Sequence, residues 1–229
     1  MRITVTLARQ LGCGGSYLGQ CLAEKLQIRC LDREIVSRAA KQLALDENEL
    51  AHREERGSTF WERMLRGVSP GPPEALYHVP LTLSFSDQEV FEAETEVMKE
   101  IAAGEDCVIV GRVASHVLPP HPGMVNLFLH APLGFRVRRL LELSQAADEA
   151  QARTIIAHSD ETRCRFINQM IGRDRDDAKN YHLCLDTSAL PFPDLLELMT
   201  DFVRRKTAGM PGLSTASVHP YGAGRSAVP

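Results

Sequence analysis

The sequence lacks the long apolar run that a membrane-spanning helix requires. Such a helix needs about 20 consecutive apolar residues, and no stretch of this 229-residue chain approaches that length. The sequence also lacks a basic surplus, because 26 Lys and Arg residues stand against 30 Asp and Glu residues, a formal net charge of −4. Proteins that bind nucleic-acid polymers present a basic surface. We therefore expect neither a membrane nor a nucleic-acid polymer as a partner.

Closely paired cysteines are missing too. The chain has six cysteines and no C-x-x-C pair, which argues against a structural zinc site and a disulfide framework. We expect reduced thiols in a cytoplasmic protein, and no signal peptide because the chain runs directly into a predicted strand. Cys30, Cys107 and Cys184 lie in apolar runs, where we expect buried side chains. Cys13 lies in a predicted loop, where we expect it to be accessible, and a redox role for it is open.

One common catalytic motif is absent. The sequence contains no H-E-x-x-H, so it gives no sign of a zinc hydrolase. Hydrophobic residues make up 44% and charged residues 24% of the chain, as in ordinary globular proteins. We expect a single domain over residues 1–206 and a disordered tail over 207–229, where Gly, Ser, Ala and Pro dominate.

Short apolar runs alternate with helical patterns along the chain. Strands are predicted at Ile3–Leu7, Ile28–Leu31, Cys107–Val110, Val125–His130 and His182–Leu185. Helices are predicted at Ser16–Leu26, Arg33–Ala44, Asp87–Ala103, Leu133–Leu143, Asp148–Gln169 and Asp194–Arg205. This alternation predicts an α/β fold with a parallel sheet covered on both faces, whose ligands bind beyond the carboxyl ends of the strands.

Two segments interrupt the alternation. Residues 45–86 are charged and then loop-like, with the breaker cluster Ser69–Pro73, and we expect an insertion over the site. Residues 144–180 are dense in charge of both signs. They fit either a solvated helical hairpin with intrahelical ion pairs or a mobile lid that brings arginines over a transferred phosphate.

The first strand is followed by a glycine-rich loop and then a helix. Its residues Gly12, Cys13, Gly14, Gly15 and Ser16 stand at the predicted helix start. Backbone N–H groups there, together with the helix dipole, favour a bound anion such as a phosphate. The alternative is a plain tight turn capped by Ser16, with Arg9 solvated.

This loop nearly fits the phosphate-binding pattern G-x-x-x-x-G-K-[ST]. With Gly14 at the second glycine, Ser16 takes the hydroxyl position, which could hold magnesium. Arg9 then stands at the first glycine and Gly15 at the lysine. Because an arginine also binds phosphate oxygens, Arg9 could supply the missing cation.

Further charged residues follow the second and third predicted strands. Asp32 and Arg33 come directly after Leu31, and Arg112 follows Gly111. Asp32 has two compatible interpretations, a helix N-cap and a group that holds magnesium-bound water or an acceptor. Arg112 is well placed for a phosphate, or it is an ordinary surface arginine.

Arginines also mark the second half of the chain. Arg136 and Arg139 lie three residues apart on one face of a predicted helix. Asp160 and Arg163 have the same spacing, which allows either an intrahelical ion pair or joint contacts with a ligand. Arg165 lies in the same predicted lid.

Taken together, these pieces resemble the cytidylate kinase-like family, a divergent branch of the P-loop nucleoside monophosphate kinases. The resemblance spans residues 3 to about 205 and rests on the order of five motifs. They are Ala8–Gly15, Leu31–Ile35, Val110–Arg112, Leu129–Pro132 leading to Arg136, and Asp160-x-x-Arg163 followed by Asn180–Leu183 and Asp186–Ser188.

The resemblance implies a three-layer P-loop kinase fold with a five-stranded parallel sheet, an acceptor-binding insertion and a helical lid. It implies transfer of the ATP γ-phosphoryl group to CMP or dCMP with Mg²⁺. The loop would cradle the donor with Arg9 as its cation, and Asp32, Arg33, Arg112 and Arg136 would meet the acceptor. Arg163 and Arg165 would close from the lid while Asp160 orients the acceptor. We expect a monomer or a weak homodimer.

The chain departs from ordinary members of this group at two positions. Gly15 stands where they keep the P-loop lysine, and Val113 stands where an aspartate follows the arginine. These departures leave three alternatives open. They are a nucleotide-binding regulatory protein, a kinase for another small acceptor, and an interaction module built on residues 45–86 and the tail.

Overall fold

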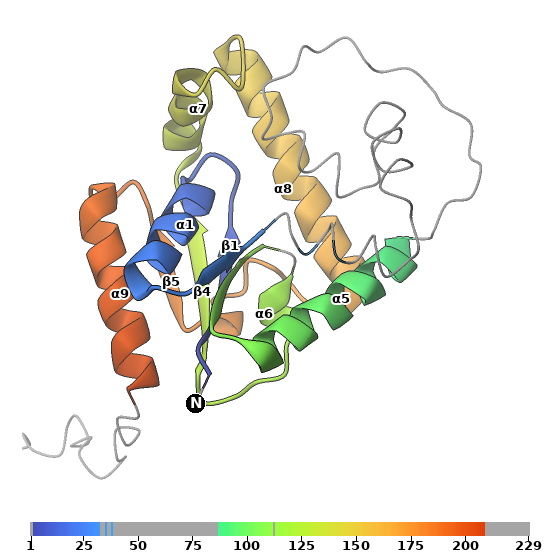
Figure 1. Ribbon diagram of the computed structural model, residues 1–229. Coiled ribbons are helices and arrows are strands. Elements are labelled where there is room, and N and C mark those ends of the chain that lie inside the picture. Colours follow the sequence, from blue (N-terminus) through green and yellow to red (C-terminus); the bar gives the residue numbers. More distant parts are fainter. Residues whose placement is uncertain (1, 33–34, 36–37, 39–86, 112, 209–229) are drawn as a thin grey trace, which may run out of the picture.

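The computed structural model describes residues 2–32, 35, 38, 87–111 and 113–208 (Figure 1). The strands are β1 (Thr4–Arg9), β2 (Arg29–Leu31), β3 (Cys107–Val110), β4 (Met124–His130) and β5 (Leu183–Asp186). The helices are α1 (Gly15–Leu26), α5 (Asp87–Gly104), α6 (Ala114–Val117), α7 (Leu133–Glu142), α8 (Glu149–Ile171), the 3₁₀ turn η1 (Ala178–Asn180) and α9 (Phe192–Thr207).

The five strands form one parallel sheet in the order β2-β3-β1-β4-β5. The predicted five-stranded parallel sheet is therefore confirmed. β1 lies in the middle and continues two residues beyond its predicted end, because its pairing with β4 runs on until Arg9 lies beside Leu129. The glycine loop thus leaves the sheet at its centre.

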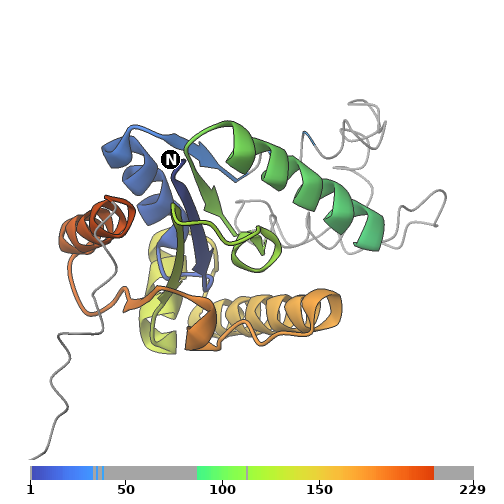
Figure 2. The ribbon, with the colours of Figure 1, turned by 90° about the horizontal axis from the view of Figure 1, so that it is seen from below.

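Helices cover both faces of this sheet (Figure 2). On one face, Leu18 and Leu22 of α1 pack with Met199 of α9 against Leu7 and Leu127. On the other face, α5 contributes Val97, Met98 and Ile101 to a second core around Ile109. This explains why the strand runs are continuously apolar rather than alternating.

The edge strands explain which cysteines are buried. Cys107 on the interior strand β3 is fully buried, as predicted. Cys30 on β2 and Cys184 on β5 are only half-buried, because each of these strands lies at an edge of the sheet. All six cysteines are free thiols.

Helices α7 and α8 stand at the carboxyl edge of the sheet (Figure 1). Leu11 of the glycine loop packs with Leu140 of α7 and Ile156 of α8. Farther along α8, Phe166 packs against Val113. Within the predicted lid over residues 144–180, the structure has one long helix, α8, followed by the turn η1, rather than a helical hairpin. Helix α8 packs against the glycine loop through Ile156 and against Val113, which follows β3, through Phe166.

Several predictions lie outside the described residues. These are most of the helix expected over Arg33–Ala44, the insertion at 45–86 and the tail from residue 209 onward. In the part that the structure describes, no helix has the length and apolar character needed to cross a membrane.

Candidate functional site

The glycine loop joins β1 to α1 through two residues in the left-handed region. Gly12 and Gly14 both have φ 82°, a conformation that side chains with a β-carbon rarely adopt. Gly14 is the N-cap of α1, and no side chain of the described residues caps this helix. Ser16 therefore does not cap the turn, and the start of α1 offers amide hydrogens to a ligand.

Cys13 is not accessible, which corrects the expectation from the sequence. Its side chain is fully buried in the core between α1 and the sheet, and its thiol donates to the carbonyl oxygen of Leu129 at 3.4 Å. Burial raises the pKa of the Cys13 thiol. The loop turns its residue-13 side chain inward, so Cys13 has a structural role and is a poor redox centre.

Arg9 lies across the loop, in the space that a longer residue 15 would need. A β-carbon added to Gly15 would lie 2.6 Å from Cβ of Arg9. The Arg9 Nε donates to Ser16 Oγ at 3.3 Å, and its Nη2 lies 3.6 Å from Oδ2 of Asp32. The Arg9 guanidinium also lies against Gly111, where any β-carbon would collide with it. One cation thus joins the ends of three strands to the start of α1.

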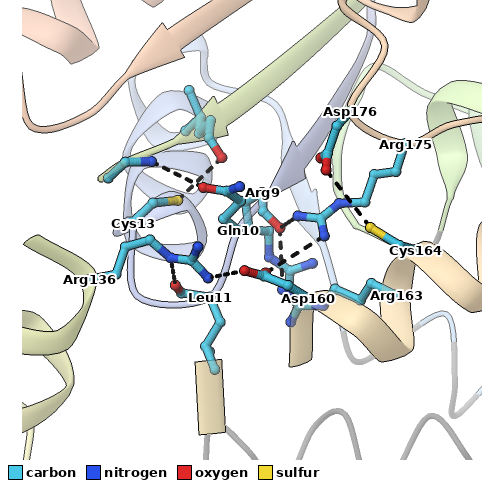
Figure 3. A network of polar contacts seen from close by, with 12 residues as sticks. Arg9, Gln10, Leu11, Cys13, Arg136, Asp160, Arg163, Cys164, Arg175 and Asp176 are labelled. Atoms are coloured by element: carbon cyan, nitrogen blue, oxygen red, sulfur yellow. Dashed lines mark hydrogen bonds and ion pairs between the residues drawn. The ribbon is translucent and has the colours of Figure 1, made fainter. Parts of the chain in front are cut away.

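Three further arginines are buried beside the loop (Figure 3). Arg136, Arg163 and Arg175 are exposed by only 4%, 7% and 3%. Arg136 donates from Nε to the carbonyl oxygen of Leu11 at 2.7 Å and from Nη2 to Oδ2 of Asp160 at 2.7 Å. It therefore ties α7 to both the loop and α8.

Arg163 and Arg175 both donate to the carbonyl oxygen of Arg9. The distances are 3.3 Å from Nη1 of Arg163 and 2.9 Å from Nη2 of Arg175. Burial, with the neighbouring charges of Arg9 and Arg175, lowers the pKa of Arg163 to about 9. Asp160 is shared, because its Oδ1 lies 3.8 Å from Nη1 of Arg175 while its Oδ2 accepts from Arg136.

Among the described residues, the carboxylates do not balance the buried arginines. Three buried guanidiniums, those of Arg136, Arg163 and Arg175, meet here, and Asp160 is the carboxylate that pairs with two of them. Burying unbalanced charge is costly. A bound anion would supply the missing negative charge, so the site suits a polyanionic ligand.

The structure brings together most of the predicted site residues that it describes. Arg9, Ser16, Asp32, Arg136, Asp160 and Arg163 lie in one connected group. Asp160 and Arg163 do not form the intrahelical ion pair that their spacing allows. Asp160 accepts a hydrogen bond from Arg136, and Arg163 donates to the carbonyl oxygen of Arg9. Arg33 and Arg112 lie outside the described residues.

Arg175, rather than the predicted Arg165, lies beside the glycine loop. The side chain of Arg165 is 70% exposed and pairs with Glu161 at 2.5 Å on the outer face of α8. Arg175 reaches the cluster, and sequence reasoning missed it. It lies in the run Arg173–Asp177, where charges of both signs alternate and nothing singles out one arginine.

Val113 is a buried apolar residue and not a polar group that could bind an acceptor. It is 8% exposed and packs with Phe166 and Ile167 of α8. Its φ of 59° is unusual for a β-branched residue. The side chain that follows residue 112 is thus part of an apolar contact.

A cavity of about 300 Å³ lies on the other side of the loop. It is lined by Phe135, Arg138, Arg139, Glu142, Thr187, Leu190, Pro191 and Phe192. The Arg139 guanidinium stands 4.7 Å from the centre of the Phe192 ring, which also stacks on Tyr17 at 6.0 Å. Phe192 covers Gly14, where a β-carbon would collide with the ring. A flat aromatic group could stack in this cavity next to the loop.

The loop residues fit a nucleotide with its magnesium. Among the described residues, no group of three or more His, Cys, Asp and Glu side chains could hold a metal alone. Mg²⁺ is commonly held by substrate phosphates and one or two protein oxygens. Ser16 Oγ and the Asp32 carboxylate, both next to the Arg9 guanidinium, are the oxygens available for that arrangement.

Comparisons with known proteins agree with this fold. An uncharacterized protein from Eubacterium ventriosum ATCC 27560 is similar in structure, with a TM-score of 0.65, 18% identity, and coverage of 90% of this chain and 99% of that chain. A gluconokinase from Sinorhizobium meliloti 1021 has a TM-score of 0.51, 15% identity, and coverage of 91% and 96%. These likenesses confirm the α/β P-loop kinase fold.

The curated protein sequences include no match to this chain. A model of the cytidylate kinase-like family matches residues 4–189, from the start of β1 to the turn after β5. That match includes the glycine loop, Arg136, Asp160, Arg163 and Arg175. The chain therefore belongs to the cytidylate kinase-like family.

Proposed function

We propose that this protein transfers the γ-phosphoryl group of ATP to a nucleoside monophosphate, CMP or dCMP, in the cytoplasm. The observation that carries the proposal is the group of three buried arginines beside an uncapped glycine loop, with one carboxylate paired to them in the part of the chain that the structure describes. Phosphoryl transfer needs in-line positioning and charge neutralisation more than covalent help. This group supplies both.

The donor side of the site is the loop with the cavity beside it. Amide hydrogens of residues 12–16 would bind the donor phosphates, and the Arg9 guanidinium would take the place of the P-loop lysine. Its position supports this role, since it donates to Ser16 Oγ and excludes a side chain at residue 15. Magnesium that enters with the nucleotide would neutralise negative charge on the donor phosphates, and Ser16 and Asp32 are the residues that would hold it. The cavity bounded by Arg139 and Phe192 would hold the base.

The acceptor side faces α8. Arg112 and Arg136 are the predicted contacts of the acceptor phosphate, with Arg163 above the moving group. Asp160 would hold Arg136 and Arg175 in place through its two oxygens. Helix α8 packs over the loop through Ile156, so it would exclude water and suppress ATP hydrolysis.

One observation favours an acceptor other than a cytosine nucleotide. Val113 lies in an apolar contact with α8, where ordinary cytidylate kinases have the aspartate that helps to hold the acceptor. A kinase for another small acceptor is therefore the second candidate, with the same donor site.

A coupled assay with ATP and Mg²⁺ separates these functions. CMP, dCMP, UMP and AMP are offered in turn, and ADP release is followed together with the phosphorylated product. Turnover with CMP or dCMP supports the proposal, and turnover with another acceptor supports the second candidate. If calorimetry shows ATP binding but no acceptor gives turnover, the protein is a nucleotide-binding protein without kinase activity. Gel filtration with light scattering tests whether the protein is a monomer or a weak homodimer.

A further inference from the structure

Thr187 is a buried threonine that directly follows β5, and its hydroxyl is turned toward the glycine loop. The hydroxyl oxygen lies 2.7 Å from the carbonyl oxygen of Cys13 and 3.2 Å from the carbonyl oxygen of His130. A hydroxyl has a single hydrogen, so the shorter contact, the one with Cys13, is the stronger hydrogen bond. Thr187 therefore holds the glycine loop from outside it.

The turn that carries Thr187 is itself fixed by hydrogen bonds on both sides. The Thr187 N–H donates to the carbonyl oxygen of His130, at the end of β4, at 2.9 Å. The Asp186 carboxylate accepts from the N–H and from the hydroxyl of Ser188, at 2.8 Å and 2.7 Å. These bonds restrict the backbone on either side of Thr187, so its hydroxyl stays directed at the loop.

The hydrogen bond to Cys13 sets the direction of the next amide. The peptide between Cys13 and Gly14 is trans, as are all peptides of the described residues. The carbonyl oxygen and the N–H of a planar trans peptide point in opposite directions. Because Thr187 holds the Cys13 oxygen, the Gly14 N–H points to the side of the loop away from Thr187. Among the described residues this N–H makes no hydrogen bond, so it is available to an anion.

The peptide between Leu11 and Gly12 repeats this arrangement. Arg136 donates to the carbonyl oxygen of Leu11 at 2.7 Å (Figure 3). Gly12 and Gly14 both have φ 82°, and each follows a carbonyl oxygen that a side chain from outside the loop holds. Helix α7 and the turn after β5 thus orient two amides of the loop by the same means.

The turn after β5 touches Gly14 at a second point. Thr187 lines the cavity beside the loop together with Leu190, Pro191 and Phe192. A β-carbon on Gly14 would lie 2.4 Å from Cζ of Phe192. Phe192 thus covers Gly14, while Thr187 holds the carbonyl oxygen that precedes it. One turn therefore contacts both the cavity proposed for the base and the amides proposed for the phosphates.

We propose that Thr187 is a positioning residue for the donor nucleotide, because its hydroxyl holds the Cys13 carbonyl oxygen and thereby aims the Gly14 N–H at the donor phosphates. Thr187 acts through the loop and does not itself touch a phosphate. Valine has the same shape without the hydroxyl, so Thr187→Val would leave the Cys13 oxygen without its donor and the peptide free to turn. This inference rests on the proposed function for the identity of the donor.

Calorimetry on the full chain separates the phosphates from the base. ATP, inorganic tripolyphosphate and adenosine are titrated, in the presence of Mg²⁺, against wild type, Thr187→Val and Thr187→Ser. Loss of one charge-assisted hydrogen bond predicts binding of ATP and of tripolyphosphate about tenfold weaker in Thr187→Val. Adenosine has no phosphate, so its affinity should be unchanged. Thr187→Ser keeps the hydroxyl and should bind ATP as wild type does.

Thr200→Val is the matched control. Thr200 and Thr187 are both 1% exposed, and the Thr200 hydroxyl donates to the carbonyl oxygen of Leu196 within α9 at 2.6 Å. The exchange removes a comparable buried hydrogen bond away from the loop, so it should leave the affinities for ATP and tripolyphosphate unchanged. Should Thr187→Val fail to fold, Thr187→Ala takes its place, with Thr187→Ser as the rescue.

Amide NMR spectra of protein labelled at its glycines report on the Gly14 N–H directly. Tripolyphosphate should shift the Gly14 amide resonance in wild type and in Thr187→Ser, and should leave it nearly in place in Thr187→Val. A merely structural role of Thr187 would not produce this difference, because it predicts the same shift wherever the protein is folded.

The outcomes separate the positioning role from the kinase. Wild-type ATP affinity in Thr187→Val, a loss that Thr187→Ser does not restore, or an equal loss in Thr200→Val or for adenosine overturns the inference. ATP binding that depends on the Thr187 hydroxyl without turnover on any acceptor defeats only the proposed kinase. Turnover with unchanged ATP affinity in Thr187→Val defeats only the positioning role. If wild type binds neither ATP nor tripolyphosphate, both proposals are wrong.

Discussion

Arg9 and Gly15 occupy one space: a β-carbon at residue 15 would lie 2.6 Å from Cβ of Arg9, closer than two such carbons approach in folded proteins. The loop can therefore carry a side chain at residue 9 or at residue 15, but not at both. This packing accounts for the glycine at residue 15, where the phosphate-binding pattern has a lysine.

Exchanging the two residues tests this relationship. Arg9→Gly should lower kcat/KM by about 100-fold or more, because it removes a cation aimed at the phosphates. Gly15→Lys alone should lower the melting temperature, since the β-carbon of the lysine would clash with the side chain of Arg9. The double variant Arg9→Gly with Gly15→Lys should recover both activity and stability. Steady-state kinetics and melting curves measure these effects, and a double variant no better than Arg9→Gly would contradict the shared role.

Gly14 should be intolerant of any side chain. Gly14→Ala adds a β-carbon in the left-handed region and drives it into Phe192, so we expect a loss of about 1–3 kcal/mol and weaker ATP binding. Gly134→Ala is the control, because the space around Gly134 on α7 is open. It should leave ATP binding unchanged and stabilise the protein slightly through helix propensity. Urea denaturation and calorimetry give both quantities.

Removing the shared carboxylate should make the site depend on added anion. Asp160→Asn leaves Arg136 and Arg175 without their counter-charge, and we expect the free energy of unfolding to fall by about 1–3 kcal/mol. Phosphate in the buffer should restore more stability in this variant than in wild type. An equal response of the two proteins to phosphate would show that the buried cations do not attract the ion.

Stability should fall as the pH drops below about 6.5, the ordinary pKa of histidine. Burial and Arg173 lower the pKa of His116, and burial and Lys206 lower the pKa of His182. Below pH 6.5 the unfolded chain therefore binds more protons than the folded protein does. The contribution of the two neutral histidines to stability is complete above pH 6.5 and is lost as the pH falls toward their lowered pKa values in the folded protein.

Each of these histidines sets a limiting slope of about 1.4 kcal/mol per pH unit. Neither ring nitrogen of His116 has a partner among the described residues, so His116→Phe should fold and flatten the profile. Urea denaturation at pH 7.5, 6.5 and 5.5 makes the comparison. A profile unchanged by His116→Phe would assign the acid sensitivity to other groups.

A substitution in the cavity beside the loop should change KM for ATP and leave KM for the acceptor unchanged. Arg139→Ala removes the cation stacked on Phe192, and we expect KM for ATP to rise by about fivefold, because a cation–π contact contributes about 1 kcal/mol. KM for the acceptor should stay constant. Initial rates at varied ATP and varied acceptor separate the two. A change confined to the acceptor would place the base elsewhere.

The sequence predicted the sheet well because its signals are local. Each strand is a short apolar run, and the glycine loop lies directly between a strand and a helix. The prediction failed at Cys13, since the direction of a loop side chain depends on two left-handed glycines and on the core beneath.

The site was harder to predict because its arginines are selected by packing. Arg165 follows Glu161 by four residues, and Arg175 stands between Asp174 and Asp176, so each has an acidic neighbour in the sequence. The structure turns Arg175 inward through contacts that are distant in sequence. Its guanidinium lies over the ring of Phe128 on β4, and Tyr181, just before β5, stacks on that ring and donates to the Arg175 carbonyl oxygen. The contact between Arg9 and Gly15, in contrast, could have been predicted. In the phosphate-binding pattern the first position is glycine and the seventh is lysine, whereas this chain has Arg9 at the first and Gly15 at the seventh.

Because Arg163 and Arg175 hold residue 9 through its peptide oxygen, every amino-acid replacement there leaves that attachment in place. Substitution of Arg9 therefore tests its side chain, with its contacts to Ser16 and Asp32, and leaves this attachment untested. An altered main chain, such as an ester introduced by chemical synthesis, would weaken the oxygen as an acceptor and show what the attachment contributes to the stability of the loop.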